Sequence, residues 1–203
     1  MRMAILLSIL IFTLFTIIYY SLLYSIGVNS SYKKPLVIIY YGSVLISQII
    51  ININVMKKLC GDGGIGKALI VTILPWGIIM GLINMLLLIF PAWKDPFSNT
   101  FGYFITKHIL GIKSFLQNDI LRKSSSSKVL EAVKHIYNDP SLLINEITMN
   151  DVNNPAWWKS MQSSIFMTTI TGQAKEKLAN IIRLKDLISE AIWIILTGIY
   201  ASM

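Results

Sequence analysis

The sequence predicts an all-α membrane protein, with three transmembrane helices in its amino-terminal half and a small helical extramembrane region after them. Three hydrophobic runs at residues 4–28, 35–56 and 68–90 predict the spans, because each has roughly the 20 apolar residues that cross a bilayer core. None of these runs contains Asp, Glu, Lys or Arg. The composition agrees, since charged residues make up only 14% of the chain, against roughly 25% in an ordinary soluble domain.

The first run is interpreted as an uncleaved membrane anchor. It follows Arg2, as the apolar core of a secretion signal would, but it is too long for such a core and no small-x-small cleavage site follows it. Tyr19, Tyr20 and Tyr24 lie near its far end, where aromatic side chains commonly anchor a helix at the membrane–water interface.

The second and third runs carry residues that are typical of helix packing. Gln48 and Asn52 lie on an Ile-rich background, and amides in lipid usually hydrogen-bond to a neighbouring helix. Pro75 predicts a kink in the third helix. Gly77 and Gly81 form a small-xxx-small face, along which another helix can approach closely. We therefore expect the spans to pack as a bundle.

The chain is expected to divide into a membrane bundle at residues 1–93, a basic helical domain at 94–185 and an apolar helix at 186–203. The middle segment contains twelve Lys and Arg against seven Asp and Glu, so it supplies +5 of the net charge of +8. A basic segment tethered to a membrane meets anionic lipid headgroups or acidic proteins. Nucleic acid is a third class of partner for such a segment, and no run of Lys and Arg is dense enough to choose among the three. No specific nucleic-acid partner is expected.

Apolar residues repeat at three- and four-residue steps after the third span, which predicts an amphipathic helix of about five turns. The repeating residues are Phe101, Phe104, Ile105, His108, Ile109, Ile112, Phe115 and Leu116. Such a helix can lie on the membrane surface or pack into a small helical domain, and both interpretations stay open. The serines at residues 124–127 break the pattern, which resumes at residues 128–137.

A last helix is expected from about Gly172 to Tyr200. Its first half is charged and its second half is apolar except for Glu190, which lies one helical turn after Asp186 and can therefore sit at headgroup depth. About seventeen apolar residues is the lower limit for a span. Two interpretations remain: a helix that re-enters the membrane as a fourth or half-inserted segment, or a buried helix of the extramembrane domain.

Nothing in the sequence indicates an enzyme, a cofactor or a metal. The loop at residues 61–67 fits a phosphate-binding pattern except that Ala68 replaces the hydroxyl residue that would bind Mg²⁺, and the loop joins two spans instead of a strand and a helix. His108 and His135 have no further ligand at metal-binding spacing. The single cysteine, Cys60, excludes an intrachain disulfide.

The segment at residues 91–103 is too aromatic for a free loop, so we expect it to fold against its own helices or a partner. Its motif is Trp93-Lys94-x-Pro96-Phe97-Ser98-Asn99-Thr100-Phe101-Gly102-Tyr103, and a second motif is Leu142-Leu143-Ile144-Asn145-Glu146-Ile147-Thr148. Together they resemble a membrane-protein family of large icosahedral DNA viruses with an internal lipid membrane. In that family Pro-Glu-Asn often follows the second motif, whereas this chain has Met149-Asn150-Asp151.

The resemblance implies a minor capsid protein, held in the virion inner membrane (host endomembrane during assembly) as part of a larger assembly. Its extramembrane segment would link the membrane to the capsid shell or to other virion membrane proteins. The residues expected to dock a partner are Trp93, Pro96, Phe97, Asn99, Phe101, Tyr103, Trp157 and Trp158. Those expected to pack helices are Gly77, Gly81, Gln48 and Asn52.

The alternative hypothesis is a small channel or transport subunit. In that case a shared polar path would be lined by Gln48, Asn52, Asn54, Asn84 and Glu190, since polar residues within membrane helices commonly mark transport pathways. No inverted repeat or second broken helix supports this hypothesis.

Overall fold

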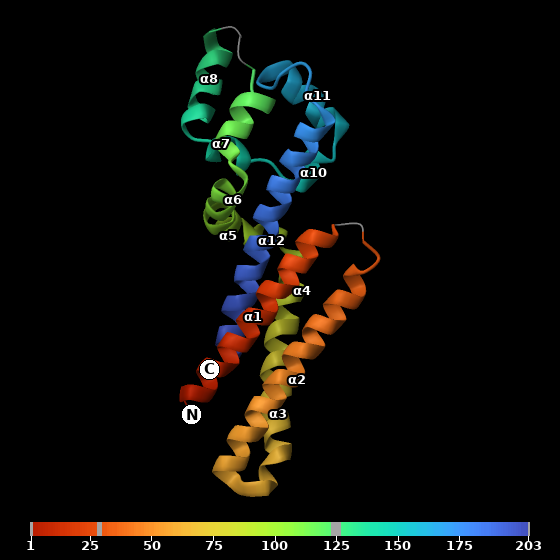
Figure 1. Cartoon of the computed structure of the whole chain (residues 1–203), viewed down its shortest axis with the longest axis vertical. Coiled ribbons are helices and arrows are strands. Elements are labelled where there is room, and N and C mark those ends of the chain that lie inside the picture. The colour runs from red at the N-terminus through yellow and green to blue at the C-terminus, as the bar shows by residue number, and fades with distance from the viewer. Residues whose placement is uncertain (1, 28–29, 123–126, 203) are drawn as a thin grey trace. The chain divides into compact units, whose positions relative to one another are not determined.

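The computed structural model describes residues 2–27, 30–122 and 127–202, and these residues are mainly helical (Figure 1). The backbone divides into two compact units. Unit 1 comprises Met1–Lys94 with Glu190–Met203, and unit 2 comprises Asp95–Ser189. The predicted fold class is confirmed, because three long apolar helices come first and a helical region that ends in a long helix follows them.

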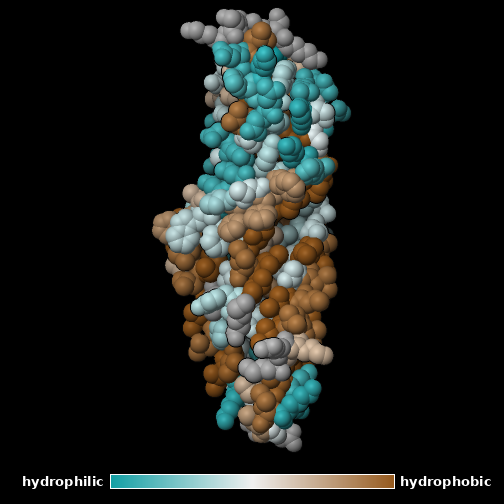
Figure 2. Space-filling view, turned by 90° about the vertical axis from the view of Figure 1, so that its left-hand side faces the viewer, coloured by the Kyte–Doolittle hydropathy of each residue, from teal (hydrophilic) through white to brown (hydrophobic). Residues whose placement is uncertain are grey.

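Unit 1 contains three helices that are long and apolar enough to cross a membrane: Met3–Ile26, Lys33–Cys60 and Ile65–Ile89. The first two lie in α1 (Arg2–Ile26) and α2 (Lys33–Cys60). The third is built from α3 (Ile65–Pro75), the turn η2 (Trp76–Met80) and α4 (Gly81–Ile89). Hydrophobic residues cover the visible face of these helices (Figure 2). Because lipid tails can cover such a surface and water cannot do so cheaply, the chain is a membrane protein.

The third span changes its helical geometry at the predicted proline. Pro75 has no amide hydrogen to donate, so the regular α-helical pattern stops there and the next turn, η2, is a wider π-helical turn. The regular α-helix resumes at Gly81. A short turn, η3 (Pro91–Lys94), then ends the part of unit 1 that comes first in the chain.

The long helix α12 (Gly172–Ser202) contributes its last residues, from Glu190 onward, to unit 1. There it runs antiparallel to α1, and three contacts fix the register of the pair: Glu190 with Tyr20, Gly198 with Phe12 and Ser202 with Ser8. The contacts are eight and four residues apart on both helices, which is the spacing of one helix face.

The pairing with α1 places the end of α12 beside a candidate membrane span. Because α1 is a candidate span from Met3 to Ile26 and α12 lies along it between Tyr20 and Ser8, we expect Glu190–Ser202 to be embedded in the membrane beside it. α12 itself is not among the three candidate spans found in the described residues.

Unit 2 is a small helical domain with its own hydrophobic core. Its elements are α5 (Asp95–Phe97), η4 (Ser98–Gly102), α6 (Tyr103–Leu110), α7 (Ile112–Phe115), η5 (Leu116–Ile120), α8 (Ser127–Asn138), α9 (Ser141–Ile144), α10 (Met149–Val152), α11 (Pro155–Ser164) and the first part of α12. The core includes Phe115, Leu116, Ile144, Trp158, Phe166, Leu178 and Ile181. An isolated antiparallel bridge joins Leu121 to Phe166.

The prediction of a single amphipathic helix after the third span is wrong, because the helix is broken at Gly111. This glycine has a φ of +59°, a left-handed conformation that residues with a Cβ adopt at a cost, and it ends α6 and precedes α7. The break divides the apolar stripe into two parts. Ile112, Phe115 and Leu116 enter the core of unit 2, whereas Phe101 and Phe104 remain exposed. The serines at 124–126, expected to end the pattern, lie outside the described residues.

Candidate functional site

The two amides expected to pack helices, Gln48 and Asn52, form hydrogen bonds to neighbouring helices of unit 1. Gln48 on α2 accepts a hydrogen bond from the Ser8 hydroxyl on α1 and donates one to the Ser8 carbonyl at 3.2 Å. Asn52 on α2 donates to the Thr72 hydroxyl on α3 at 2.8 Å. Because each amide satisfies a polar group on the next helix, this network holds α1, α2 and α3 together in an apolar medium.

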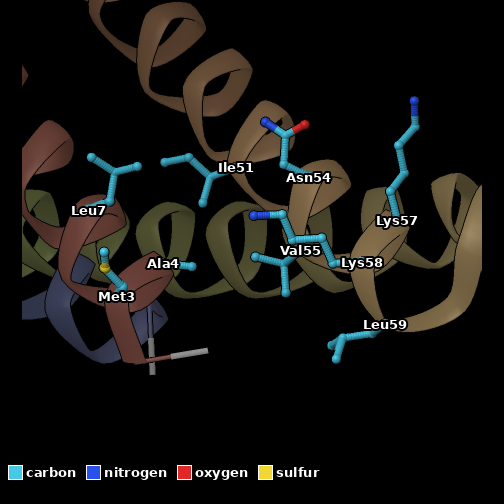
Figure 3. A pocket seen from close by; sticks show the side chains of 9 residues that line it. All are labelled: Met3, Ala4, Leu7, Ile51, Asn54, Val55, Lys57, Lys58 and Leu59. Carbon is cyan, nitrogen blue, oxygen red and sulfur yellow. The ribbon is translucent and has the colours of Figure 1, made fainter.

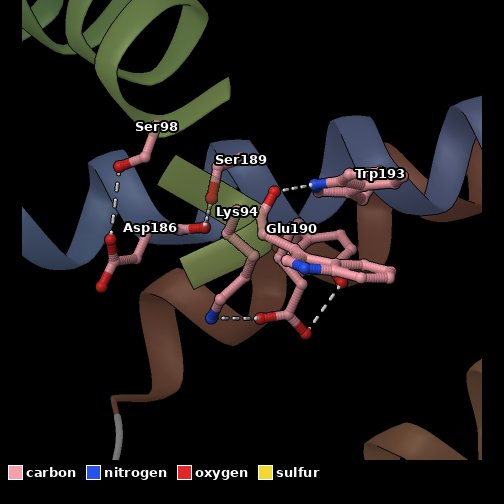
Figure 4. Close-up of polar contacts among 8 residues, drawn as sticks. Lys94, Ser98, Asp186, Ser189, Glu190 and Trp193 are labelled. Atoms are coloured by element: carbon pink, nitrogen blue, oxygen red, sulfur yellow. Dashed lines mark hydrogen bonds and ion pairs between the residues drawn. The ribbon is translucent and has the colours of Figure 1, made fainter. Parts of the chain in front are cut away.

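Glu190 is stabilised by two groups of unit 1, as Figure 4 shows. Its carboxylate accepts a hydrogen bond from the Tyr20 hydroxyl at 3.1 Å and lies 3.9 Å from the Lys94 ammonium. A carboxylate at a membrane boundary is less costly when a cation and a hydrogen-bond donor accompany it. The ion pair also joins the residues at which the chain leaves and re-enters unit 1, which are Lys94 and Glu190.

Trp93 takes part in an aromatic contact of unit 1 beside this ion pair. Its ring is stacked on Phe90 with 5.4 Å between the ring centroids, and its carbonyl accepts a hydrogen bond from the Trp193 indole at 2.8 Å (Figure 4). The Trp93 side chain nonetheless remains about half exposed. Tryptophans with one polar and one apolar contact are typical of the membrane–water interface.

Gly77 and Gly81 line a groove of about 380 Å³ together with Tyr41 and Asn84. A Cβ at either glycine would meet no atom within 4 Å, so no helix of the described chain approaches them closely. A close approach of two helices of unit 1 is found instead at Gly198, where a Cβ would overlap the Phe12 ring.

In unit 2 the two sequence motifs come together around a buried lysine. Lys185 on α12 is 3% exposed, and its ammonium donates to the Ile144 carbonyl at 2.8 Å and to the Asn99 side-chain oxygen at 3.3 Å. The Asn145 amide, from the second motif, approaches the Asn99 carbonyl at 3.5 Å. The motif residues thus form an internal contact of unit 2, a role that the sequence alone did not reveal.

The helix that carries the first motif packs tightly on α12. A Cβ at Gly102 would lie 2.6 Å from the Lys185 carbonyl oxygen, so only glycine fits this contact. The neighbouring Tyr103 hydroxyl and the Asn145 side-chain oxygen are buried without a hydrogen-bond partner among the described residues. Burial raises the pKa of Tyr103, and the nearby Asp139 carboxylate adds to the rise.

Burial lowers the pKa of Lys185 from its usual value of 10.5, and the carboxylates of Asp186, Asp95 and Glu146 only partly oppose this. As the pH rises toward 10.5, Lys185 therefore loses its proton in the folded protein before it does so in the unfolded chain. The folded protein then binds fewer protons than the unfolded chain, so its free energy of unfolding should increase over this pH range. We expect Lys185→Met to flatten this increase, as measured by urea unfolding of the full chain across that pH range. Lys159→Met, at an exposed position, should retain the increase. If the free energy of unfolding depended equally on pH in both variants, the increase could not be attributed to the lowered pKa of Lys185.

The segment from α5 to α6 has an unusual distribution of polar and apolar residues. Its small and polar face is inside unit 2, with Ser98 3% and Thr106 0% exposed. Three large apolar side chains of the same segment are exposed instead: Phe101, Phe104 and Ile109, at 53%, 60% and 65%. Phe101 and Phe104, one helical turn apart, are hereafter called the aromatic face. Helices at the surface of a water-soluble domain bury the apolar face, so this inverted arrangement indicates that something else covers the aromatic face.

The other residues expected to dock a partner lie in different environments. Pro96 is exposed, and Phe97 is half-buried with its ring stacked at 6.3 Å from that of Phe101. Trp158 is buried in the core of unit 2, where its indole donates to the Val152 carbonyl at 2.8 Å. Trp157 is half-buried and packs edge-on against Trp158 with 5.0 Å between ring centroids.

The described residues contain no group of three or more His, Cys, Asp or Glu side chains that could hold a metal ion. No family model, curated protein or solved structure matches this chain.

Proposed function

We propose that this chain is a structural component of a virion with an internal lipid membrane. Unit 1 anchors it in that membrane, and unit 2 links the membrane to the capsid shell by binding another virion protein. The observation that carries the proposal is the aromatic face, because two large aromatic side chains, Phe101 and Phe104, are exposed on the segment that follows the third span.

The composition of the aromatic face favours a protein partner. Aromatic side chains supply a large share of the binding energy at protein interfaces, and Phe101 and Phe104 offer two of them one helical turn apart. Lys107 and Lys113 are exposed on the same stretch of chain and can add contacts to acidic groups at the rim. The internal contact of Lys185 with both motifs supports this role, since it ties the segment that carries the aromatic face to α12 and α9.

The bonding of the intramembrane polar groups favours the structural role over the channel. A conducting path needs polar side chains that face a shared aqueous space. Of the five residues expected to line such a path, Gln48, Asn52 and Glu190 each bond to a neighbouring helix of unit 1, as groups that hold a bundle together do. Asn84 donates to the Met80 carbonyl of its own helix.

The test is incorporation of a Phe101→Ala/Phe104→Ala variant into assembled particles. Both side chains are more than half exposed, so their loss should leave folding and carbonate-resistant membrane insertion intact. We expect at least about tenfold less of the variant to co-purify with particles. The matched control is Leu130→Ala, which removes an apolar side chain that is 50% exposed outside the aromatic face. Equal incorporation of both variants would refute docking through this face.

A second measurement separates a protein partner from a lipid surface. A polarity-sensitive dye on Phe104→Cys, in a Cys60→Ser background, should report an apolar environment only when capsid proteins are present. The same signal from the labelled chain in liposomes without capsid proteins would assign the aromatic face to the membrane surface and would contradict the proposed link.

A further inference from the structure

A groove of about 700 Å³ lies between the start of α1 and the end of α2. It is lined by Met3, Ala4, Leu7, Ile51, Asn54, Val55, Lys57, Lys58 and Leu59 (Figure 3). We propose that it binds one anionic phospholipid, with the headgroup at the two lysines and an acyl chain along the apolar wall. This inference does not depend on the proposed link to a capsid.

The position of the groove along α2 matches the depth of a lipid headgroup. α2 has Lys33 and Lys34 at its start and Lys57 and Lys58 near its end. The 24 residues from Lys34 to Lys58 correspond to about 36 Å of helix, slightly more than the roughly 30 Å hydrocarbon core. The two pairs of lysines therefore mark the two boundaries of the bilayer, and the groove lies at one of them.

The lining separates into an apolar wall and a cationic end. Leu7 and Val55 face the space between the helices, and Ile51, which is 8% exposed, closes it on the side of α2. At the other end are two lysines and an amide, and no carboxylate is among the lining residues. A phospholipid has the complementary arrangement, with an acyl chain, polar ester groups and then a negatively charged phosphate.

Figure 3 distinguishes the two lysines of the groove. Both lysines line the groove, and their side chains extend in different directions. The Lys58 side chain points back along α2 toward Val55, whereas the Lys57 side chain does not. A folded-back lysine can place its ammonium over a headgroup while its methylene stem covers the apolar wall. Lys58 is therefore expected to be the main contact, and Lys57 to strengthen the local positive potential.

The experiment is native mass spectrometry of the full chain purified in mild detergent and titrated with phosphatidylglycerol or phosphatidylcholine. We expect the wild-type chain to retain phosphatidylglycerol in preference to phosphatidylcholine. Lys58→Gln should weaken phosphatidylglycerol binding about fivefold and leave phosphatidylcholine binding unchanged. The matched control is Lys67→Gln, an exposed lysine that follows the short turn η1 (Gly61–Gly64) at the end of α2 and is not part of the groove. Equal effects of the two substitutions would overturn the site, because binding would then follow net charge alone.

A second variant tests the acyl-chain part of the site. Ala4→Phe should fill the groove and weaken binding of both lipids, while excess inorganic phosphate should not displace bound phosphatidylglycerol from the wild-type chain. Unchanged lipid binding in Ala4→Phe, or displacement by phosphate alone, would overturn the assignment of the groove to a phospholipid.

Discussion

Gly198→Leu is expected to separate the end of α12 from α1. A Cβ at this position would overlap the fully buried Phe12 ring, which also meets Trp76 edge-on with 5.0 Å between ring centroids. Because the Phe12 ring is buried and packed against Trp76, we expect the two helices to part. Overpacking of this kind costs about 1–3 kcal/mol, and the contacts of Glu190 and Ser202 with α1 should be lost with it.

Disulfide crosslinking measures this separation directly. The Ser8 and Ser202 hydroxyls are 3.2 Å apart, so cysteines at these positions in a Cys60→Ser background should crosslink readily. Gly198→Leu should abolish most of the crosslink. Gly81→Leu is the matched control, because a Cβ there meets no atom within 4 Å. An undiminished crosslink in Gly198→Leu would show that the α1–α12 pairing does not depend on this glycine.

Gly102→Val is expected to destabilise unit 2 by about 1–3 kcal/mol. Its Cβ would lie 2.6 Å from the Lys185 carbonyl oxygen and 3.0 Å from the Lys185 Cγ. The carbonyl belongs to the backbone of α12 and cannot rotate away, so the helix with the first motif must shift. The shift would disturb the bonds of the Lys185 ammonium to Ile144 and Asn99 as well.

Pulse proteolysis of the full chain in urea can measure the loss. Gly102→Val should lower the urea concentration at which unit 2 becomes susceptible to cleavage. Gly172→Ala, at the start of α12, is the control, because it adds a methyl group where nothing lies within 4 Å. It should leave the midpoint unchanged or raise it slightly. Equal midpoints for the two variants would mean that the Gly102 contact can relax without cost.

The membrane spans could be predicted from the sequence because they depend on length and apolarity alone. The expected runs at residues 4–28, 35–56 and 68–90 correspond to the helices Met3–Ile26, Lys33–Cys60 and Ile65–Ile89, although residue 28 lies outside the described part of the chain. A bilayer is a uniform solvent for such a helix, so no knowledge of its neighbours is needed.

The candidate site could be predicted only in part. The aromatic segment at residues 91–103 was singled out by its composition, but the exposed part of it, at Phe101, continues to Phe104 and Ile109 on α6. Lys185 was missed, because a lysine followed by Asp186 in a helix is usually exposed to solvent. Gly198 was missed too, although an isolated glycine in an apolar helix was a usable signal of a close contact.

By itself the sequence determined that this is an all-α membrane protein with three amino-terminal spans and a basic helical segment, since these follow from residue types counted along the chain. Only the tertiary structure decided that the stripe after the third span divides at Gly111, that its aromatic half faces outward and that α12 returns to lie along α1. The physical reason is that periodicity shows which side of a helix is apolar, whereas the neighbour that covers that side comes from distant residues.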